Sequence, residues 1–221
     1  MDHSINQMPN NACSRRRSRW AADNNEAMNE VTIILFWVTV ALELIYLALF
    51  ILTIKLPNFR FWPPPKPRSW QFFAAWFIAS IVIMNILLLG LFDFDSFALP
   101  HLKQRLPFAI GFLVMGAAIG TWAWSTFGLR NTIGVGYQLI TRGAYQYSRN
   151  PQYISDSLSA IAYTIFTNSW MVAIVGGLGI LLNLLAPYTE ESWLEERYGE
   201  EYRQYKREVP RFIGRRHTKA G

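Results

Sequence analysis

Long apolar stretches constrain the fold of this 221-residue chain more than any other feature of its sequence. Three of them, Val31 to Ile54, Trp70 to Phe92 and Leu106 to Phe127, each exceed the roughly 20 residues that a helix needs to cross a bilayer. Hydrophobic residues make up 52% of the chain and charged residues only 16%. We therefore predict an all-α, multi-span helical membrane protein.

The fourth apolar stretch, Ile154 to Ala186, is too long for one ordinary span. Three turn-prone residues, Thr167-Asn168-Ser169, interrupt it near the middle. We predict a helical hairpin here, with one helix ending at Phe166 and the next beginning at Trp170. This makes about five transmembrane helices, with four as the alternative. Close approach of the two hairpin helices is expected at three glycines: Gly176, Gly177 and Gly179.

The segments outside the spans have different characters. Residues 1–30 are polar and are predicted to form a disordered N-terminal tail. Pro187 is expected to end the last span, and Thr189 could cap a separate amphipathic helix after it. One face of that helix would carry aromatic and apolar side chains spaced by three or four: Leu194, Tyr198, Tyr202 and Tyr205.

The distribution of basic residues predicts an orientation. With five spans, the first loop, the third loop and the C-terminal region share one side and hold 15 of the 21 Lys and Arg. That side is expected to be cytoplasmic, although the arginines of the tail would then lie on the opposite side. The positive net charge is explained by this topology, so no nucleic-acid partner is expected.

Few isolated residues suggest further chemistry. Cys13 is alone in the polar tail, and the three histidines have no ligand at suitable spacing, so no metal site is expected. Glu43 lies in the middle of the first span, where a carboxylate is costly. It either faces an acceptor pocket or is protonated or paired inside the bundle.

A polar corner precedes the hairpin. Asn150-Pro151 is typical of a helix start, with Asn as the cap and Pro at the first helical position. The free N–H groups of such a terminus favour a carboxylate or phosphate; the alternative is an interfacial aromatic belt beside a basic loop. If the hairpin forms, Glu190 and Glu191 emerge on the same side as this corner, so one site becomes possible.

These segments resemble the isoprenylcysteine carboxyl methyltransferase and phospholipid methyltransferase superfamily of integral membrane methyltransferases. The resemblance covers roughly Arg130 to Phe212 and depends on the order and spacing of several motifs. They are Leu139-Ile140-Thr141-Arg142-Gly143-Ala144-Tyr145, then Arg149-Asn150-Pro151-Gln152-Tyr153, then Glu190-Glu191, then Tyr198-Gly199, Tyr202 and Tyr205, and finally Val209-Pro210-Arg211.

The resemblance implies an enzyme whose C-terminal half, residues 129–214, binds S-adenosyl-L-methionine at the cytoplasmic surface. Residues 31–128 would supply three membrane helices and residues 215–221 a basic tail. Glu190, Glu191 and Tyr153 are the candidate catalytic residues. By position, the cofactor contacts would be Tyr137, Gln138, Leu139, Ile140, Tyr145, Asn150, Pro151, Gln152, Tyr153 and Glu190.

The acceptor is expected to be a lipophilic small molecule or a lipidated group in the bilayer, carrying a carboxylate, an amine or a thiol. The prenylcysteine enzymes carry an Arg about one turn before the acidic pair, and this chain has Leu185-Ala186-Pro187-Tyr188-Thr189 there. That difference favours an amine, a thiol or another head group over a carboxylate. The alternatives are a sterol or steroid-type membrane reductase that uses NADPH and a non-catalytic multi-span protein.

Overall fold

The computed structural model describes residues 10–56, 58–66, 68–128 and 139–213, and all regular secondary structure in these ranges is helical. This confirms the predicted all-α class. The described residues form five α-helices and one short 3₁₀-helix: α1 (Asn10–Lys55), α2 (Trp70–Phe92), α3 (Leu102–Phe127), η1 (Gly143–Gln146), α5 (Pro151–Thr167) and α6 (Trp170–Glu208).

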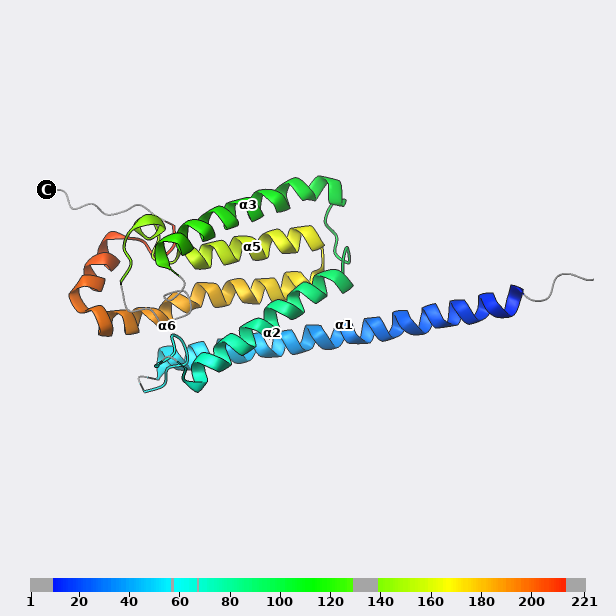
Figure 1. Ribbon diagram of the computed structural model, residues 1–221, viewed down its shortest axis with the longest axis horizontal. Helices are drawn as coiled ribbons and strands as arrows, with labels where there is room; N and C mark the ends of the chain where they lie inside the picture. Colours follow the sequence, from blue (N-terminus) through cyan, green and yellow to red (C-terminus); the bar gives the residue numbers. More distant parts are fainter. Residues whose placement is uncertain (1–9, 57, 67, 129–138, 214–221) are drawn as a thin grey trace, which may run out of the picture.

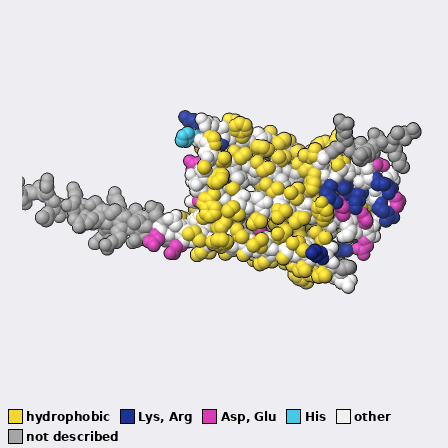
Figure 2. Space-filling view, turned by 180° about the vertical axis from the view of Figure 1, so that it is seen from behind, with side chains coloured by type: hydrophobic (Ala, Val, Ile, Leu, Met, Phe, Trp, Pro, Cys, Tyr) yellow, Lys and Arg dark blue, Asp and Glu magenta, His cyan; other side chains and the backbone are white. Residues whose placement is uncertain are grey.

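Four of these helices are long and apolar enough to cross a membrane: Met28–Lys55 of α1, Trp70–Phe92, Leu102–Thr126 and Trp170–Glu208. Their large apolar side chains are exposed over most of the bundle, including Trp37, Phe77, Leu91 and Phe108. Figure 2 shows this surface as a broad hydrophobic band with Lys and Arg gathered at one end. An apolar surface of this extent requires a lipid environment, so the chain is an integral membrane protein.

The predicted hairpin is confirmed by α5 and α6. The first helix ends at Thr167, Asn168 adopts the left-handed conformation, and the second helix begins at Trp170. Ser169 caps α6 by accepting a hydrogen bond from the backbone N–H of Val172 at 3.0 Å. Because the turn is so short, α5 and α6 run side by side in opposite directions, with α3 on the other side of α5 (Figure 1).

Glycines allow α3 and α5 to approach closely. A Cβ at Gly120 would lie only 2.5 Å from the hydroxyl of Ser155, and one at Gly116 would lie 3.1 Å from the backbone oxygen of Ser155. The Ser155 hydroxyl donates a hydrogen bond to the carbonyl of Gly116 at 2.8 Å. Small residues at such a crossing let two backbones make direct polar contacts within a membrane.

The glycines of α6 do not all serve the hairpin, which corrects the sequence prediction. Gly176 faces α5, where a Cβ would lie 3.1 Å from the hydroxyl of Thr164. Gly179 instead faces α1, because the nearest atom to a Cβ there is the Glu43 carboxyl oxygen at 3.6 Å. Space around Gly177 is open among the described residues. Successive residues of a helix point 100° apart, so neighbouring glycines meet different helices.

The prediction that Pro187 ends the last span is wrong, since α6 continues through it to Glu208. Thr189 does not cap a new helix; its hydroxyl donates to the carbonyl of Ala186 at 2.7 Å. The non-helical residue is Gly199, with φ 55° and ψ −126°, a conformation that glycine adopts without a Cβ clash. The C-terminal part of α6 turns back across the end of the bundle (Figure 1).

The helix α1 also departs from the prediction of a disordered tail over residues 1–30, because it is helical from Asn10 onward. Between Asn10 and Val31 the chain contains neither glycine nor proline. Once a helix is nucleated, each added residue gains a backbone hydrogen bond, so the apolar span can propagate the helix into its polar leader. Figure 1 shows this part of α1 extending well beyond the other helices.

A polar cluster lies at the end of the bundle away from the C-terminal part of α6. It joins the loop between α2 and α3 to the turn between α5 and α6. Arg105, only 3% exposed, donates to the Asp95 carboxylate at 2.7 Å and to the carbonyl of Phe166. Asn168 also donates to Asp95 at 2.7 Å. The hydrogen bonds from Asn168 and Arg105 hold the pKa of Asp95 below its ordinary value. This cluster fixes the hairpin turn to the loop between α2 and α3.

Glu43 is buried between α1 and α6. Its side chain is 2% exposed, and neither carboxyl oxygen has a hydrogen-bond partner among the described residues. It is therefore not paired with any described group, so of the expected alternatives only pairing inside the bundle is excluded for that part of the chain. A polar group left unpaired in an apolar interior costs free energy of folding.

Replacing Glu43 by leucine is expected to stabilise the protein, because an apolar side chain of similar size removes an unpaired buried polar group. We expect the Glu43→Leu variant to gain about 2 kcal/mol, measured as a higher midpoint of thermal unfolding in detergent. The matched control is Glu201→Leu at an exposed position of α6, which should stay within about 0.5 kcal/mol. A lower midpoint for Glu43→Leu would contradict the prediction.

Candidate cofactor site

The two adjacent glutamates of α6 have entirely different surroundings. Glu190 accepts hydrogen bonds from two neutral donors, the indole N–H of Trp62 at 2.7 Å and the phenol of Tyr153. Both donors bond the same carboxylate oxygen, Oε1. Oε2 accepts no hydrogen bond from any described residue. Glu190 is therefore fixed through one oxygen, and the other is available to a ligand.

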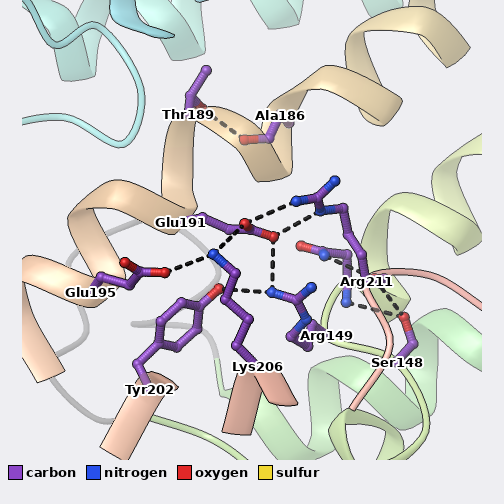
Figure 3. A network of polar contacts seen from close by, with 10 residues as sticks. Ser148, Arg149, Ala186, Thr189, Glu191, Glu195, Tyr202, Lys206 and Arg211 are labelled. Atoms are coloured by element: carbon purple, nitrogen blue, oxygen red, sulfur yellow. Dashed lines mark hydrogen bonds and ion pairs between the residues drawn. The ribbon is translucent and has the colours of Figure 1, made fainter. Parts of the chain in front are cut away.

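Glu191 is instead surrounded by cations, as Figure 3 shows. Its carboxylate lies 2.8 Å from a guanidinium nitrogen of Arg149, 2.7 Å from Nε of Arg211 and 3.1 Å from Nζ of Lys206. The side chain is only 11% exposed. Three cations around one mostly buried carboxylate bind the start of α5, the end of α6 and the segment after it into one unit.

Arg211 is held by two kinds of contact within the protein. Its guanidinium makes two hydrogen bonds to Glu191 and lies 3.9 Å from the centre of the Tyr188 ring. The hydrogen bonds that Arg211 donates to Glu191 raise the pKa of Arg211, so the side chain stays charged. A planar guanidinium suits both contacts at once, because it can pair with a carboxylate and stack on a ring.

The Asn150-Pro151 corner begins α5 as predicted, but Asn150 does not cap it with its side chain. Its side-chain amide donates to the carbonyl of Arg211 at 2.9 Å, and its backbone N–H donates to the hydroxyl of Ser148 at 3.1 Å. The backbone N–H of Arg149 donates to the carbonyl of Pro210 at 3.0 Å. The corner therefore binds the C-terminal segment of the chain itself.

The other residues that were predicted to contact the cofactor lie near these polar contacts or outside the described residues. Tyr145 is buried with Tyr202 and Tyr205, and Leu139 and Ile140 pack against the same cluster. Burial raises the pKa of Tyr145, so its phenol stays neutral. Gln152 is half-buried in the first turn of α5. Two of the predicted cofactor residues, Tyr137 and Gln138, lie outside the described residues.

The hairpin brings together residues that are far apart in sequence, as predicted. Arg149 meets Glu191 and Tyr153 meets Glu190, so the corner and the acidic pair form one polar end of the bundle. The predicted aromatic face of the C-terminal helix packs inward, with Tyr202 joining this network by its contact with Arg149 at 3.4 Å.

Two residues near the site were not singled out from the sequence. Trp62 lies 128 positions before its partner Glu190, and no periodic pattern connects two such positions. Asp156 was overlooked inside an apolar stretch, although an acidic residue there is the same signal that marked Glu43. Its side chain is exposed on α5, one helical turn after Tyr153. Among the described residues, no group of three or more His, Cys, Asp or Glu could hold a metal ion.

A comparison with protein-family models identifies the class of the protein. Residues 105–201 match the family described as phospholipid methyltransferase. The match begins in α3 and ends in the last part of α6, and so contains the hairpin and both glutamates. No curated protein and no solved structure matches the chain.

Through this segment, which is somewhat less than half of its length, the chain is similar to the phospholipid methyltransferase family. It is an integral membrane methyltransferase that uses S-adenosyl-L-methionine. The resemblance predicted from the motifs is thereby confirmed, and neither the reductase nor the non-catalytic reading is supported.

The cation cluster makes Glu191 important for the stability of this end of the bundle. Replacing it by glutamine removes the charge that three cations share, and breaking a buried ion pair costs about 3 kcal/mol. We expect Glu191→Gln to lower the thermal unfolding midpoint by several degrees. The control is Glu200→Gln, which removes a carboxylate that pairs with two cations but is 66% exposed, so the unfolding midpoint should change little. Equal effects of the two substitutions would contradict the structural role.

Proposed function

We propose that the polar end of the bundle binds S-adenosyl-L-methionine between the α5 corner and Glu190 and methylates an amine on a lipid-like acceptor. The observation that carries this proposal is the environment of Glu190, a carboxylate held by neutral donors through one oxygen only. The family match supports the methyltransferase class, and a lipid-type acceptor follows from the family. The acceptor group and the residues with their roles are our proposals.

The donor fits the residues that are present. A sulfonium and an ammonium group need negative charge nearby, and Oε2 of Glu190 supplies it without losing an existing hydrogen bond. The carboxylate of the donor needs a cation or an N–H donor. The buried Nε of Arg149 has no partner among the described residues and can serve as one. Tyr145 and Tyr153 would add aromatic walls, as the family motifs suggest.

The charges at this site favour an amine over a carboxylate as the acceptor group. Arg149, Lys206 and Arg211 are all bonded to Glu191, and the turn of α6 before Glu190 carries no arginine. A second carboxylate would therefore find no uncommitted cation among these residues. A cationic head group, in contrast, is attracted to the unpaired oxygen of Glu190 and to Asp156.

The chemistry requires alignment and the removal of one proton. S-adenosyl-L-methionine supplies a methyl group already activated by its sulfonium, so the protein mainly has to hold the two reactants in line and exclude water. An ammonium acceptor must lose a proton before its nitrogen can attack. We assign this step to Asp156, which makes no hydrogen bond to a described residue and lies about 8 Å along α5 from its first residue.

The fifth span predicted from the sequence is α5, and we propose that it crosses the membrane together with the four longer helices. Its 17 residues are about 26 Å long, close to the roughly 30 Å of the hydrocarbon core. It lies beside α3 and α6 and runs between the same two ends of the bundle (Figure 1). The basic residues gathered at the site end favour placing that end in the cytoplasm (Figure 2).

Binding of S-adenosylhomocysteine to the detergent-purified protein tests the donor site. We expect the wild type to bind it and Glu190→Ala to bind about ten to a hundred times more weakly, because a hydrogen bond to a charged group is lost. Glu201→Ala on the exposed face of α6 is the matched control and should bind like the wild type. Calorimetry measures all three, and binding of NADPH in place of S-adenosylhomocysteine would overturn the proposal.

Methyl transfer to defined acceptors tests the acceptor class. We expect labelled methyl groups to pass to phosphatidylethanolamine in mixed micelles and not to a prenylcysteine carboxylate. Asp156→Asn should lower the turnover number about a hundred-fold because the proton acceptor is lost, while its affinity for S-adenosylhomocysteine stays unchanged. Transfer to the prenylcysteine alone, or an unchanged turnover number in Asp156→Asn, would contradict the amine assignment.

A further inference from the structure

The connector between α1 and α2 lies against the C-terminal part of α6, although it is outside the segment that matches the family. Two polar contacts join them. Arg60 pairs with Glu196 at 2.7 Å, and the indole N–H of Trp62 donates to Glu190 at 2.7 Å. The connector thus contributes a direct partner to a residue of the proposed donor site.

Trp62 is held in place by the residue before it. Phe61 is fully buried and packs edge-on against Tyr46, with 5.3 Å between ring centres. Its backbone N–H donates to the hydroxyl of Thr53 at 3.0 Å, which fixes the connector to the end of α1. The Trp62 ring also meets Trp76 of α2 in an edge-on contact at 6.5 Å. The indole N–H is therefore directed by packed rings and a backbone hydrogen bond.

The two hydrogen bonds to Oε1 determine how the Glu190 carboxylate is rotated. With a single donor, the carboxylate could turn about its last side-chain bond to other angles while keeping that one hydrogen bond. Trp62 and Tyr153 come from different parts of the chain and meet at one oxygen, so this rotation would break at least one of the two hydrogen bonds. Oε2 is left as the oxygen that a ligand can use.

We propose that Trp62 is a positioning residue that acts through Glu190 and aims its Oε2 at the amino group of the bound donor. This rests on the proposed function, in which Glu190 binds that group. The donor site is then completed by a segment outside the matched family region. A carboxylate that is oriented before binding loses less conformational entropy when the ligand arrives. Removing the Trp62 N–H should therefore weaken the affinity for the donor, although Trp62 does not contact the donor itself.

The test compares two tryptophan substitutions by calorimetric titration with S-adenosylhomocysteine, which retains the donor's amino group. Trp62→Phe keeps the ring and removes the N–H, and it should raise Kd about ten-fold. Trp76→Phe is the matched control, because Trp76 touches the same ring but makes no hydrogen bond to Glu190. It should change Kd less than about two-fold. Wild-type affinity in Trp62→Phe, or equal weakening in Trp76→Phe, would overturn the inference.

A double-mutant cycle separates positioning from a general loss of packing. In the Glu190→Gln background there is no free carboxylate oxygen to aim, so adding Trp62→Phe should change Kd less than two-fold. Titrations to millimolar S-adenosylhomocysteine keep a hundred-fold loss measurable. A further ten-fold weakening in the double variant would show that Trp62 acts independently of Glu190. If the wild type itself does not bind S-adenosylhomocysteine, the proposed function fails; if it binds normally and only the cycle fails, the inference alone is wrong.

Discussion

Because α5 and α6 are joined by the short turn at Asn168 and Ser169, the first residues of α5 must lie beside residues of α6 about 26 Å from that turn. The polar end of the bundle depends on this hairpin. Without it, the Asn150-Pro151 corner and the acidic pair would lie a membrane thickness apart. The turn is itself fixed, since Asn168 and Arg105 share the carboxylate of Asp95.

Helical geometry then divides two identical side chains between two tasks. Glu190 and Glu191 are consecutive, so they point about 100° apart around α6. One meets the aromatic connector and Tyr153, and the other meets Arg149, Lys206 and Arg211. Three cations satisfy Glu191 and make it part of the framework, whereas Glu190 keeps an oxygen for a ligand. By residue type both are catalytic candidates, because residue type alone does not reveal the direction of a side chain.

Other differences between prediction and structure have a common origin. Pro187 was expected to end a helix and Thr189 to begin one, yet α6 runs through both and deviates only at Gly199. Local signals for helix ends are weak compared with the packing of a long helix, and membrane helices tolerate proline where the surroundings satisfy the freed backbone group. Asn150 likewise has the right type for a cap, but its amide binds the carbonyl of Arg211, a residue whose proximity only the fold creates.

The sequence by itself determined the class of architecture, the hairpin and the motif region, because apolar run length, turn-forming residues and motif spacing are local properties. These were enough to predict the resemblance to the family and the meeting of the Asn150-Pro151 corner with the acidic pair. Tertiary structure alone decided that Trp62 reaches Glu190, that Gly179 faces Glu43, and that three cations meet at Glu191. Those contacts join residues from separate helices, and their geometry depends on how the helices are rotated and packed, which no local pattern encodes.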